Sequence, residues 1–141
     1  MAWYGDPGRA YSYSGVRLEP LPWTARLADL KRRVEAVSLT RFNSVLLNYY
    51  RDNNDSMGMH SDDEKELGAT PTIASISLGA ERTFILKSKL DPHTKSTRIV
   101  LASGSLLPMR DDTQKNYKHG VPKETKTLSS RVNLTFRAVL F

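Results

Sequence analysis

The longest helical pattern along the chain lies between Pro22 and Val37. Its apolar residues recur at steps of three and four, and charged residues fall between them. These apolar positions are Leu27, Leu30, Val34 and Val37. Such a period places the apolar side chains on one face of a helix. The sequence therefore predicts one long amphipathic helix at 22–37.

After this helix the pattern changes to short β-type runs that are separated by turn residues. The runs lie near 43–51, 72–78, 82–87, 97–102, 104–109, 116–121 and 131–140. Many short strands at this spacing are typical of a sandwich, a barrel or a jelly roll. We therefore expect a mainly β fold of the α+β class, with residues 43–141 forming the β core.

The first 20 residues are rich in Gly, Pro, Tyr and Ser. The alternation Tyr11-Ser12-Tyr13-Ser14 predicts a short strand between turns at 5–8 and at Gly15. The segment 1–20 is therefore interpreted as an aromatic flap.

Length and composition narrow the class of protein. With 141 residues, 39% of them hydrophobic and 26% charged, the chain is expected to form a single domain over 1–141. Because it shows no apolar run of membrane-spanning length and no signal-peptide pattern, an intracellular location is expected, cytoplasmic or, in a eukaryote, nuclear. Cysteine is absent, so any metal must be bound through nitrogen and oxygen.

The chain is basic, with 21 Lys and Arg against 15 Asp and Glu and a formal net charge of +6. Such a charge favours a polyanionic partner through counterion release. Many basic domains of this size bind no nucleic acid, so the charge alone decides nothing.

Candidate metal ligands begin with a His-x-Asp pair, His60 and Asp62. In a strand, side chains two residues apart share a face, so these two project in the same direction. An isolated pair of this kind is more often part of an ordinary surface. Of the other two histidines, His93 lies in a polar loop, whereas His119 lies in a β-type run and is the better third ligand. Two imidazoles and one carboxylate form the facial triad that holds non-haem Fe(II).

The run at 131–137 carries two different faces if it forms a strand. One face is polar, with Arg131, Asn133, Thr135 and Arg137, and the other is apolar. The polar face could simply lie in water, as in many antiparallel sandwiches. Inside a barrel, its two guanidinium groups would suit a dicarboxylate. Asn48 and Tyr50 share one face of the run 43–51 and could complete such a site.

With these residues the chain resembles the AlkB family of nucleic-acid dealkylating oxygenases over nearly its whole length. The most specific motif is Asn-Leu-Thr-Phe-Arg at 133–137, whereas His-x-Asp alone is not specific. The matching segments are 4–6, 11–15, 48–50, 60–64, 73–79, 104–107, 119 and 131–137.

The resemblance implies a double-stranded β-helix, or jelly roll. It further implies an enzyme that holds Fe(II) as its metal cofactor and consumes 2-oxoglutarate and O₂. The implied catalytic and metal-binding residues are His60, Asp62 and His119. The implied 2-oxoglutarate site consists of Asn48, Tyr50, Arg131, Asn133, Thr135 and Arg137. The positions matched to the alkylated base are Tyr11, Tyr13, Asp63 and Glu64. The tyrosines could instead be core aromatics, and 62–66 could be a solvated acidic turn.

Three features depart from the family pattern. Pro108 interrupts the run after 104–107 and predicts an edge strand or a bulge. Tyr49 stands where relatives often carry arginine, but it is expected to point away from the 2-oxoglutarate site. The sequence begins at the flap, so part of the substrate-recognising lid is expected to be missing, which favours single strands over duplexes.

The expected activity is oxidative demethylation of N-alkylated bases, such as 1-methyladenine and 3-methylcytosine, in DNA or RNA by a monomeric enzyme. Decarboxylation of 2-oxoglutarate would be coupled to hydroxylation of the alkyl group and release of an aldehyde. Two alternatives stay open. One is a related oxygenase acting on RNA, protein or a small molecule, and the other is a nucleic-acid-binding module with impaired catalysis.

Overall fold

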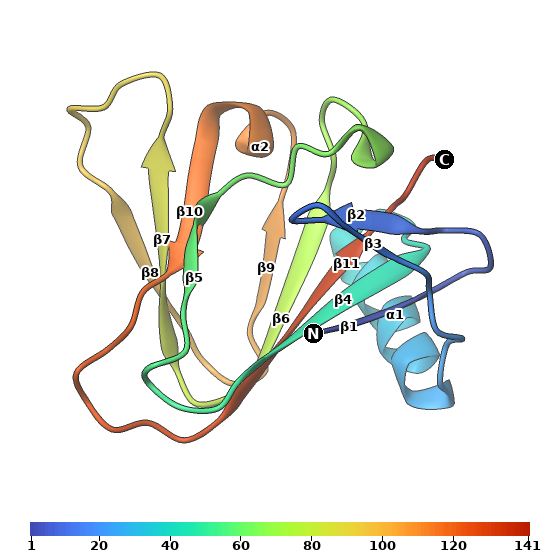
Figure 1. Ribbon diagram of the computed structural model, residues 1–141, viewed down its shortest axis with the longest axis horizontal. Coiled ribbons are helices and arrows are strands. Elements are labelled where there is room, and N and C mark those ends of the chain that lie inside the picture. The colour runs from blue at the N-terminus through green and yellow to red at the C-terminus, as the bar shows by residue number, and fades with distance from the viewer.

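The computed structural model describes residues 1–141 and is built mainly of antiparallel sheets (Figure 1). The larger sheet has the strand order β1 (Ala2–Gly5), β4 (Ser44–Tyr50), β11 (Arg131–Arg137), β6 (Ile73–Gly79) and β9 (Leu106–Met109). The smaller sheet has the order β5 (Met57–His60), β10 (Tyr117–Val121), β7 (Arg82–Ser88) and β8 (Thr97–Leu101). The expected mainly β class is therefore confirmed, and the two sheets are consistent with a jelly roll.

The two sheets face one another across a shared core. Leu46 and Ile73 from the larger sheet belong to the same buried cluster as Phe84 and Leu101 from the smaller sheet. Tyr11 joins this cluster from a separate hairpin. The hairpin consists of β2 (Tyr11–Tyr13) and β3 (Val16–Leu18). Only part of the segment 1–20 forms this hairpin, because Ala2–Gly5 is strand β1 of the larger sheet; the role of the segment as a flap stays a prediction.

The helix α1 (Ala25–Ser38) covers the outer face of the larger sheet (Figure 1). It has only 14 residues and begins at Ala25. The prediction of a long helix at 22–37 was therefore wrong in both length and position. The start is set by Thr24, whose side chain accepts a hydrogen bond of 3.1 Å from the backbone N–H of Leu27. Pro22 therefore precedes the helix.

The apolar stripe of α1 is only partly buried. Val34 is buried against the sheet, and Leu27 and Leu30 pack at the edge of the same cluster. Val37 was expected on this stripe but is 69% exposed in the last turn of the helix. The spacing of the apolar residues correctly predicted which face of the helix packs on the sheet. It did not predict that this contact ends before Val37.

The strand β11 lies at the centre of the larger sheet and carries the two faces predicted for it. Leu134 and Phe136 are buried under α1 in one cluster. Asn133 and Thr135 point to the other side and line the space between the sheets. The polar face of β11 is therefore internal, and the alternative of a solvated sandwich face is wrong.

All seven predicted strand runs form strands, with ends that differ by a few residues; the run 131–140 ends at Arg137. β1, β3 and β5 were not predicted. Pro108 lies in β9, an edge strand of the larger sheet, as expected. The remaining short elements are η1 (Lys65–Leu67) and α2 (Thr113–Asn116). Neither α1 nor α2 has the length and apolar character needed to cross a lipid bilayer.

Candidate metal and acid-binding site

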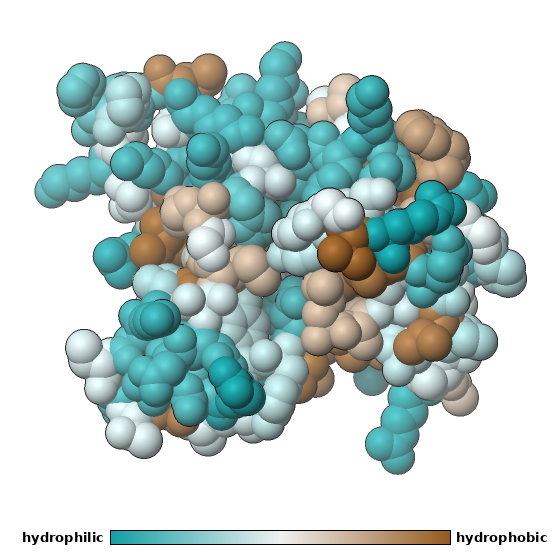
Figure 2. All heavy atoms as spheres, in the orientation of Figure 1, coloured by the Kyte–Doolittle hydropathy of each residue, from teal (hydrophilic) through white to brown (hydrophobic).

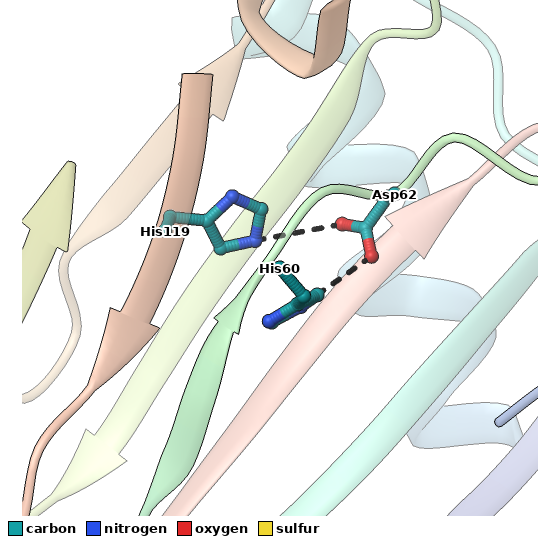
Figure 3. Close-up of side chains that lie close together, drawn as sticks. All are labelled: His60, Asp62 and His119. Atoms are coloured by element: carbon teal, nitrogen blue, oxygen red, sulfur yellow. Dashed lines mark ion pairs between the residues drawn. The ribbon is translucent and has the colours of Figure 1, made fainter. Parts of the chain in front are cut away.

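Adjacent strands bring His60 and His119 together. The two residues are direct partners across β5 and β10, and their ring centroids are 4.5 Å apart. Asp62 lies two residues beyond the end of β5, so it does not share a strand with His60, contrary to the expectation from strand periodicity. Its carboxylate nevertheless faces both rings (Figure 3), with each Nε2 at 3.7 Å from one of its oxygens. The candidate ligand atoms of all three residues lie within 4.8 Å of one another.

The ring of each histidine presents Nε2 to the carboxylate for a different reason. His60 Nδ1 lies 2.7 Å from the carbonyl oxygen of Gly58, which orients the ring and leaves Nε2 facing Asp62. The buried ring of His119 stacks on Phe84 with centroids 5.3 Å apart. Orientation through the second ring nitrogen, as in His60, is typical of metal-binding histidines.

The carboxylate of Asp62 is almost completely buried, at 1% exposure. Burial alone would raise its pKa, but Arg137, with His119 and His60, outweighs burial, and the pKa lies below its usual value. Arg137 Nη2 is 3.4 Å from Oδ1. The backbone N–H of Asp62 donates a 2.8 Å hydrogen bond to the side-chain oxygen of Gln114. The carboxylate is therefore ionised and held in place.

The protonation states of Asp62 and His119 suit a divalent metal. Burial lowers the pKa of His119 to about 4, against the opposing charge of Asp62, so the imidazole is neutral at physiological pH. Metal ligands must be deprotonated to bind. In addition, Asp62 Oδ1 is buried without a hydrogen-bond donor. A carboxylate and two imidazoles form the nitrogen and oxygen donor set preferred by Fe(II), so these residues fit the metal.

One pocket between the sheets joins this cluster to the polar face of β11. Every residue expected at the 2-oxoglutarate site lines it, together with the three candidate metal ligands. These six residues are Asn48, Tyr50, Arg131, Asn133, Thr135 and Arg137. They lie on β4 and β11, where Asn48 faces Asn133 and Tyr50 faces Arg131 in the strand register.

Arg131 has hydrogen-bond donors to spare at the far end of this pocket. Its Nη2 donates to Ser77 Oγ at 2.9 Å, whereas Nε and Nη1 are buried without any acceptor. The guanidinium carbon lies 4.8 Å from the ring centroid of Tyr50. Buried, unpaired guanidinium donors are costly in a protein interior, and a carboxylate would satisfy both. The residues present therefore fit an acidic ligand.

Neighbouring polar groups hold the rest of the β11 face. The amide of Asn133 donates to Ser75 Oγ at 2.8 Å and to the carbonyl oxygen of Ile76 at 3.0 Å. Arg137 Nη1 donates to Thr135 Oγ1 at 2.6 Å. These bonds fix the side chains and leave few alternative rotamers.

The four residues matched to the base differ in whether they reach the pocket. Tyr13 lines the pocket and its hydroxyl donates to Met57 Sδ at 3.3 Å. Tyr11 does not line it; this ring is buried and stacks on Trp3 with centroids 4.7 Å apart. Asp63 is exposed, and Glu64 is half-buried with a pKa that burial raises. Of the four, only Tyr13 lines the pocket.

Two buried polar residues near the site, Gln114 and Arg82, were not predicted to have a role. Gln114 lies in α2, in a polar stretch between two predicted strand runs, and the sequence gives no sign of its burial. Arg82 occupies the first position of β7, where an arginine is ordinarily expected to be exposed, yet it is 1% exposed. His93, in contrast, is exposed in the loop between β7 and β8, as expected.

Comparison with known proteins agrees with this geometry. The sequence model of the 2OG-Fe(II) oxygenase superfamily matches residues 1–137. The chain is 45% identical to alpha-ketoglutarate-dependent dioxygenase alkB homolog 3 of Mus musculus, over 98% of its length, and 43% identical to DNA oxidative demethylase ALKBH2 of Homo sapiens, over 99%. The chain belongs to the AlkB family of 2OG-Fe(II) oxygenases. It spans about half the length of these curated relatives, 50% and 56%.

A plant relative and a solved structure extend the AlkB comparison. DNA oxidative demethylase ALKBH2 of Arabidopsis thaliana is 40% identical over 93% of this chain and 49% of its own length. The solved structure of OsALKBH1 superposes with a TM-score of 0.66 over 85% of this chain and 66% of that chain, at 21% identity. At this identity the likeness supports the fold alone.

Proposed function

We propose that this chain is an iron- and 2-oxoglutarate-dependent oxygenase that demethylates N-alkylated bases in nucleic acid. The observation that carries the proposal is the shared pocket. Its one end holds the buried carboxylate and two imidazoles, and its other end holds Arg131 with two unpaired donors. The relatives named above as dioxygenases and DNA oxidative demethylases support the same reaction class.

Each part of the pocket has a role in this proposal. His60, Asp62 and His119 would hold Fe(II), which supplies the oxidation of an alkyl carbon by O₂ as 2-oxoglutarate is decarboxylated to succinate. Arg131 binds the distal carboxylate of 2-oxoglutarate as a two-donor fork, and Tyr50 adds a hydroxyl. The remaining polar side chains of β4 and β11 orient the co-substrate.

Substrate placement falls to the flap. Tyr13 projects into the pocket and would stack on an extruded base, while Tyr11, buried below it, supports the hairpin. Contacts of Asp63 and Glu64 with the base edge stay a prediction. Hydroxylation of the N-alkyl group gives a product that collapses to the free base and an aldehyde. The protein contributes placement and exclusion of water.

The charge of the surface fits a nucleic-acid partner. Lys87, Lys89 and Lys118 line one hollow with Met59, the residue next to His60 in sequence. The face drawn in Figure 2 is mostly hydrophilic, with hydrophobic residues in small separate groups. These lysine side chains, from the sheet that carries His60 and His119, would contact phosphates, which position the strand without reading its sequence.

The decisive experiment combines turnover and product analysis. The protein is reconstituted with Fe(II) without oxygen, then given 2-oxoglutarate, air and DNA or RNA oligonucleotides carrying 1-methyladenine or 3-methylcytosine. We expect equal amounts of demethylated base, formaldehyde and succinate. Asp62→Ala should form none of them, and Arg131→Ala should need far more 2-oxoglutarate. Succinate without demethylation of any oligonucleotide would move the proposal to another substrate class.

We further propose that single strands are preferred over duplexes. A base in a single strand is already free to stack on Tyr13, whereas unpairing a duplex base costs on the order of a few kcal/mol. Matched oligonucleotides with one 3-methylcytosine, assayed at two salt concentrations, test this. We expect faster repair of the single strand and weaker binding at higher salt. Faster repair of the duplex would contradict the preference.

Finally, we propose that residues 1–141 form one domain that acts as a monomer. Support comes from the shared core, in which Trp3 near the start and Val139 near the end of the sequence pack in one cluster. Sedimentation at the assay concentration, with and without an oligonucleotide, tests the oligomeric state. A dimer that dissociates with loss of activity would rule out the monomer.

A further inference from the structure

Arg82 is a buried arginine that does not line the pocket. Its guanidinium donates to three backbone carbonyls: Nη1 to Asp52 at 3.1 Å, and Nη2 to Asp55 at 2.7 Å and to Pro122 at 2.9 Å. Burying a charge costs several kcal/mol unless hydrogen bonds compensate for it. An arginine at this position therefore binds loop backbone in place of solvent.

The three carbonyls belong to two loops that meet at one end of the molecule. The loop after β4 and the loop before β11 lie side by side at the lower edge of Figure 1. The backbone N–H of Glu124 donates to the carbonyl oxygen of Asn53 at 3.0 Å, and the Asn53 amide donates to the carbonyl oxygen of Glu124 at 2.9 Å. Arg82 thus ties together the segments that follow Tyr50 and precede Arg131.

The same guanidinium also contacts the ring of Tyr50. The Arg82 guanidinium carbon lies 5.4 Å from the ring centroid of Tyr50, and that of Arg131 lies 4.8 Å from the same centroid. Tyr50 is 5% exposed and its ring has two cationic neighbours. Cation–π contacts of this kind are strongest when they are desolvated. The ring is therefore restrained from the side of Arg82 as well as from the pocket.

We propose that Arg82 is a positioning residue for the acid-binding end of the pocket, acting through Tyr50 and the two loops. The inference rests on the proposed function, because it assumes that Tyr50 and Arg131 bind 2-oxoglutarate. Arg82 itself touches neither the metal ligands nor the pocket. Its loss frees the ring of Tyr50 and loosens the start of β11, so affinity for the co-substrate falls while the metal site stays intact.

The test measures binding of 2-oxoglutarate by calorimetry to protein loaded with Mn(II) in place of Fe(II). We expect Arg82→Met to weaken this binding about ten- to a hundredfold, the range usual for supporting residues of a site. Arg82→Lys keeps the charge but not the fork that reaches three carbonyls, so a smaller loss is expected. Affinity for Mn(II) should change less than about twofold in both variants.

Two controls separate positioning from general stability. Arg51→Met removes the exposed ion pair between Arg51 and Asp55 in the same loop and should leave 2-oxoglutarate affinity unchanged. In a Tyr50→Leu background, Arg82→Lys should cost less affinity than in the wild type, because the contact with the Tyr50 ring is gone and only the loop contacts remain.

Three results would overturn the inference: unchanged affinity in folded Arg82→Lys, equal losses with and without Tyr50, or an equal loss in Arg51→Met. Should Arg82→Met not fold, Arg82→Lys and the double variant decide the matter. Wild-type protein that binds Mn(II) but not 2-oxoglutarate would overturn the proposed function itself. Wild-type binding with unaltered Arg82 variants would overturn only the role of Arg82.

Discussion

Among the individual side chains, Asp62 connects the candidate metal site to the polar face of β11. Its carboxylate meets both imidazoles at 3.7 Å and the guanidinium of Arg137 at 3.4 Å. Because it lies between a candidate metal site and an arginine of the acid site, it links metal binding to co-substrate orientation. Substitutions at this residue should therefore affect both.

We expect alanine at His60, Asp62 or His119 to remove iron binding and turnover, because an incomplete triad holds Fe(II) weakly and does not order its open positions. His93→Ala is the matched control, as this exposed histidine lies in the loop between β7 and β8. Iron retained after anaerobic gel filtration measures the effect. Loss of iron in the His93 variant but not in the His119 variant would show the ligand assignment to be wrong.

A second residue-level prediction concerns Gln114, whose side-chain oxygen accepts a hydrogen bond from the backbone N–H of Asp62. Gln114→Leu leaves this buried N–H unpaired and frees the segment that carries the carboxylate. We expect iron affinity to fall about tenfold or more, as for other supporting residues of metal sites. Competition with a fluorescent chelator measures it. Gln114→Glu restores the acceptor and should recover most of the affinity; equal losses in both variants would argue against this role.

The cluster of candidate metal ligands could be predicted from the sequence, whereas the residues that support it could not. Histidines such as His60 and His119 are rare in this chain, and Asp62 follows His60 by two residues. Residue type and spacing therefore point to a metal site. Gln114 and Arg82 are ordinary surface residue types, and only the long-range folding of α2 and β7 buries them. Tyr11 and Tyr13 share a pattern, yet their three-dimensional surroundings differ.

Among the strands, β11 illustrates how alternating apolar and polar residues predict which side chains pack against a helix and which line a pocket. Alternation along 131–137 predicted one packed face and one polar face, and the packed face lies under α1. The pairing of β11 with β4 and β6 joins segments over 50 residues apart, and no local pattern specifies such pairs. β1 and β5 were missed because each has only four residues and contains glycine.

Gly79 is the last residue of β6, where the chain turns away from β11. Gly79 has φ +99° and faces Arg131 in the strand register. A Cβ atom there would collide with the carbonyl oxygen of Ser130. Gly79→Ala should therefore lower the free energy of unfolding by about 2 kcal/mol or more and displace the start of β11, weakening 2-oxoglutarate binding.

Urea unfolding and calorimetric titration measure the two effects of Gly79→Ala. The matched control is Gly104→Ala, since Gly104 also has positive φ, +83°, but an added Cβ would meet nothing within 4 Å. Its backbone strain should cost stability without altering co-substrate affinity. Equal losses of affinity in the two variants would contradict the proposed link to β11.

For the whole molecule, burial of the candidate ligands couples stability to pH. Burial lowers the pKa of His119 from about 6.5 to about 4, so the unfolded chain takes up a proton at a higher pH than the folded chain. The free energy of unfolding of the metal-free protein should therefore fall as pH decreases from 6.5 to 4, by on the order of 2–3 kcal/mol. Asp62, whose pKa is lowered, adds to the loss in more acidic solution, whereas Glu64, whose pKa burial raises, opposes it.

Urea unfolding in the presence of a chelator, at several pH values between 4 and 7, measures this dependence. His119→Gln should flatten the profile between pH 6.5 and 4, and His93→Gln should leave it unchanged. A wild-type profile that is flat over this interval would show that the imidazole of His119 titrates normally.

The central position of β11 also has a kinetic consequence. Its backbone amides are hydrogen-bonded to β4 on one side and to β6 on the other, whereas β2 and β3 pair only with each other. Strands enclosed on both sides usually exchange their amide hydrogens only on global opening, and isolated hairpins exchange on local opening. Local opening at the tip of the hairpin, beyond the buried Tyr11, would therefore leave intact the strand that carries Arg131 and Asn133.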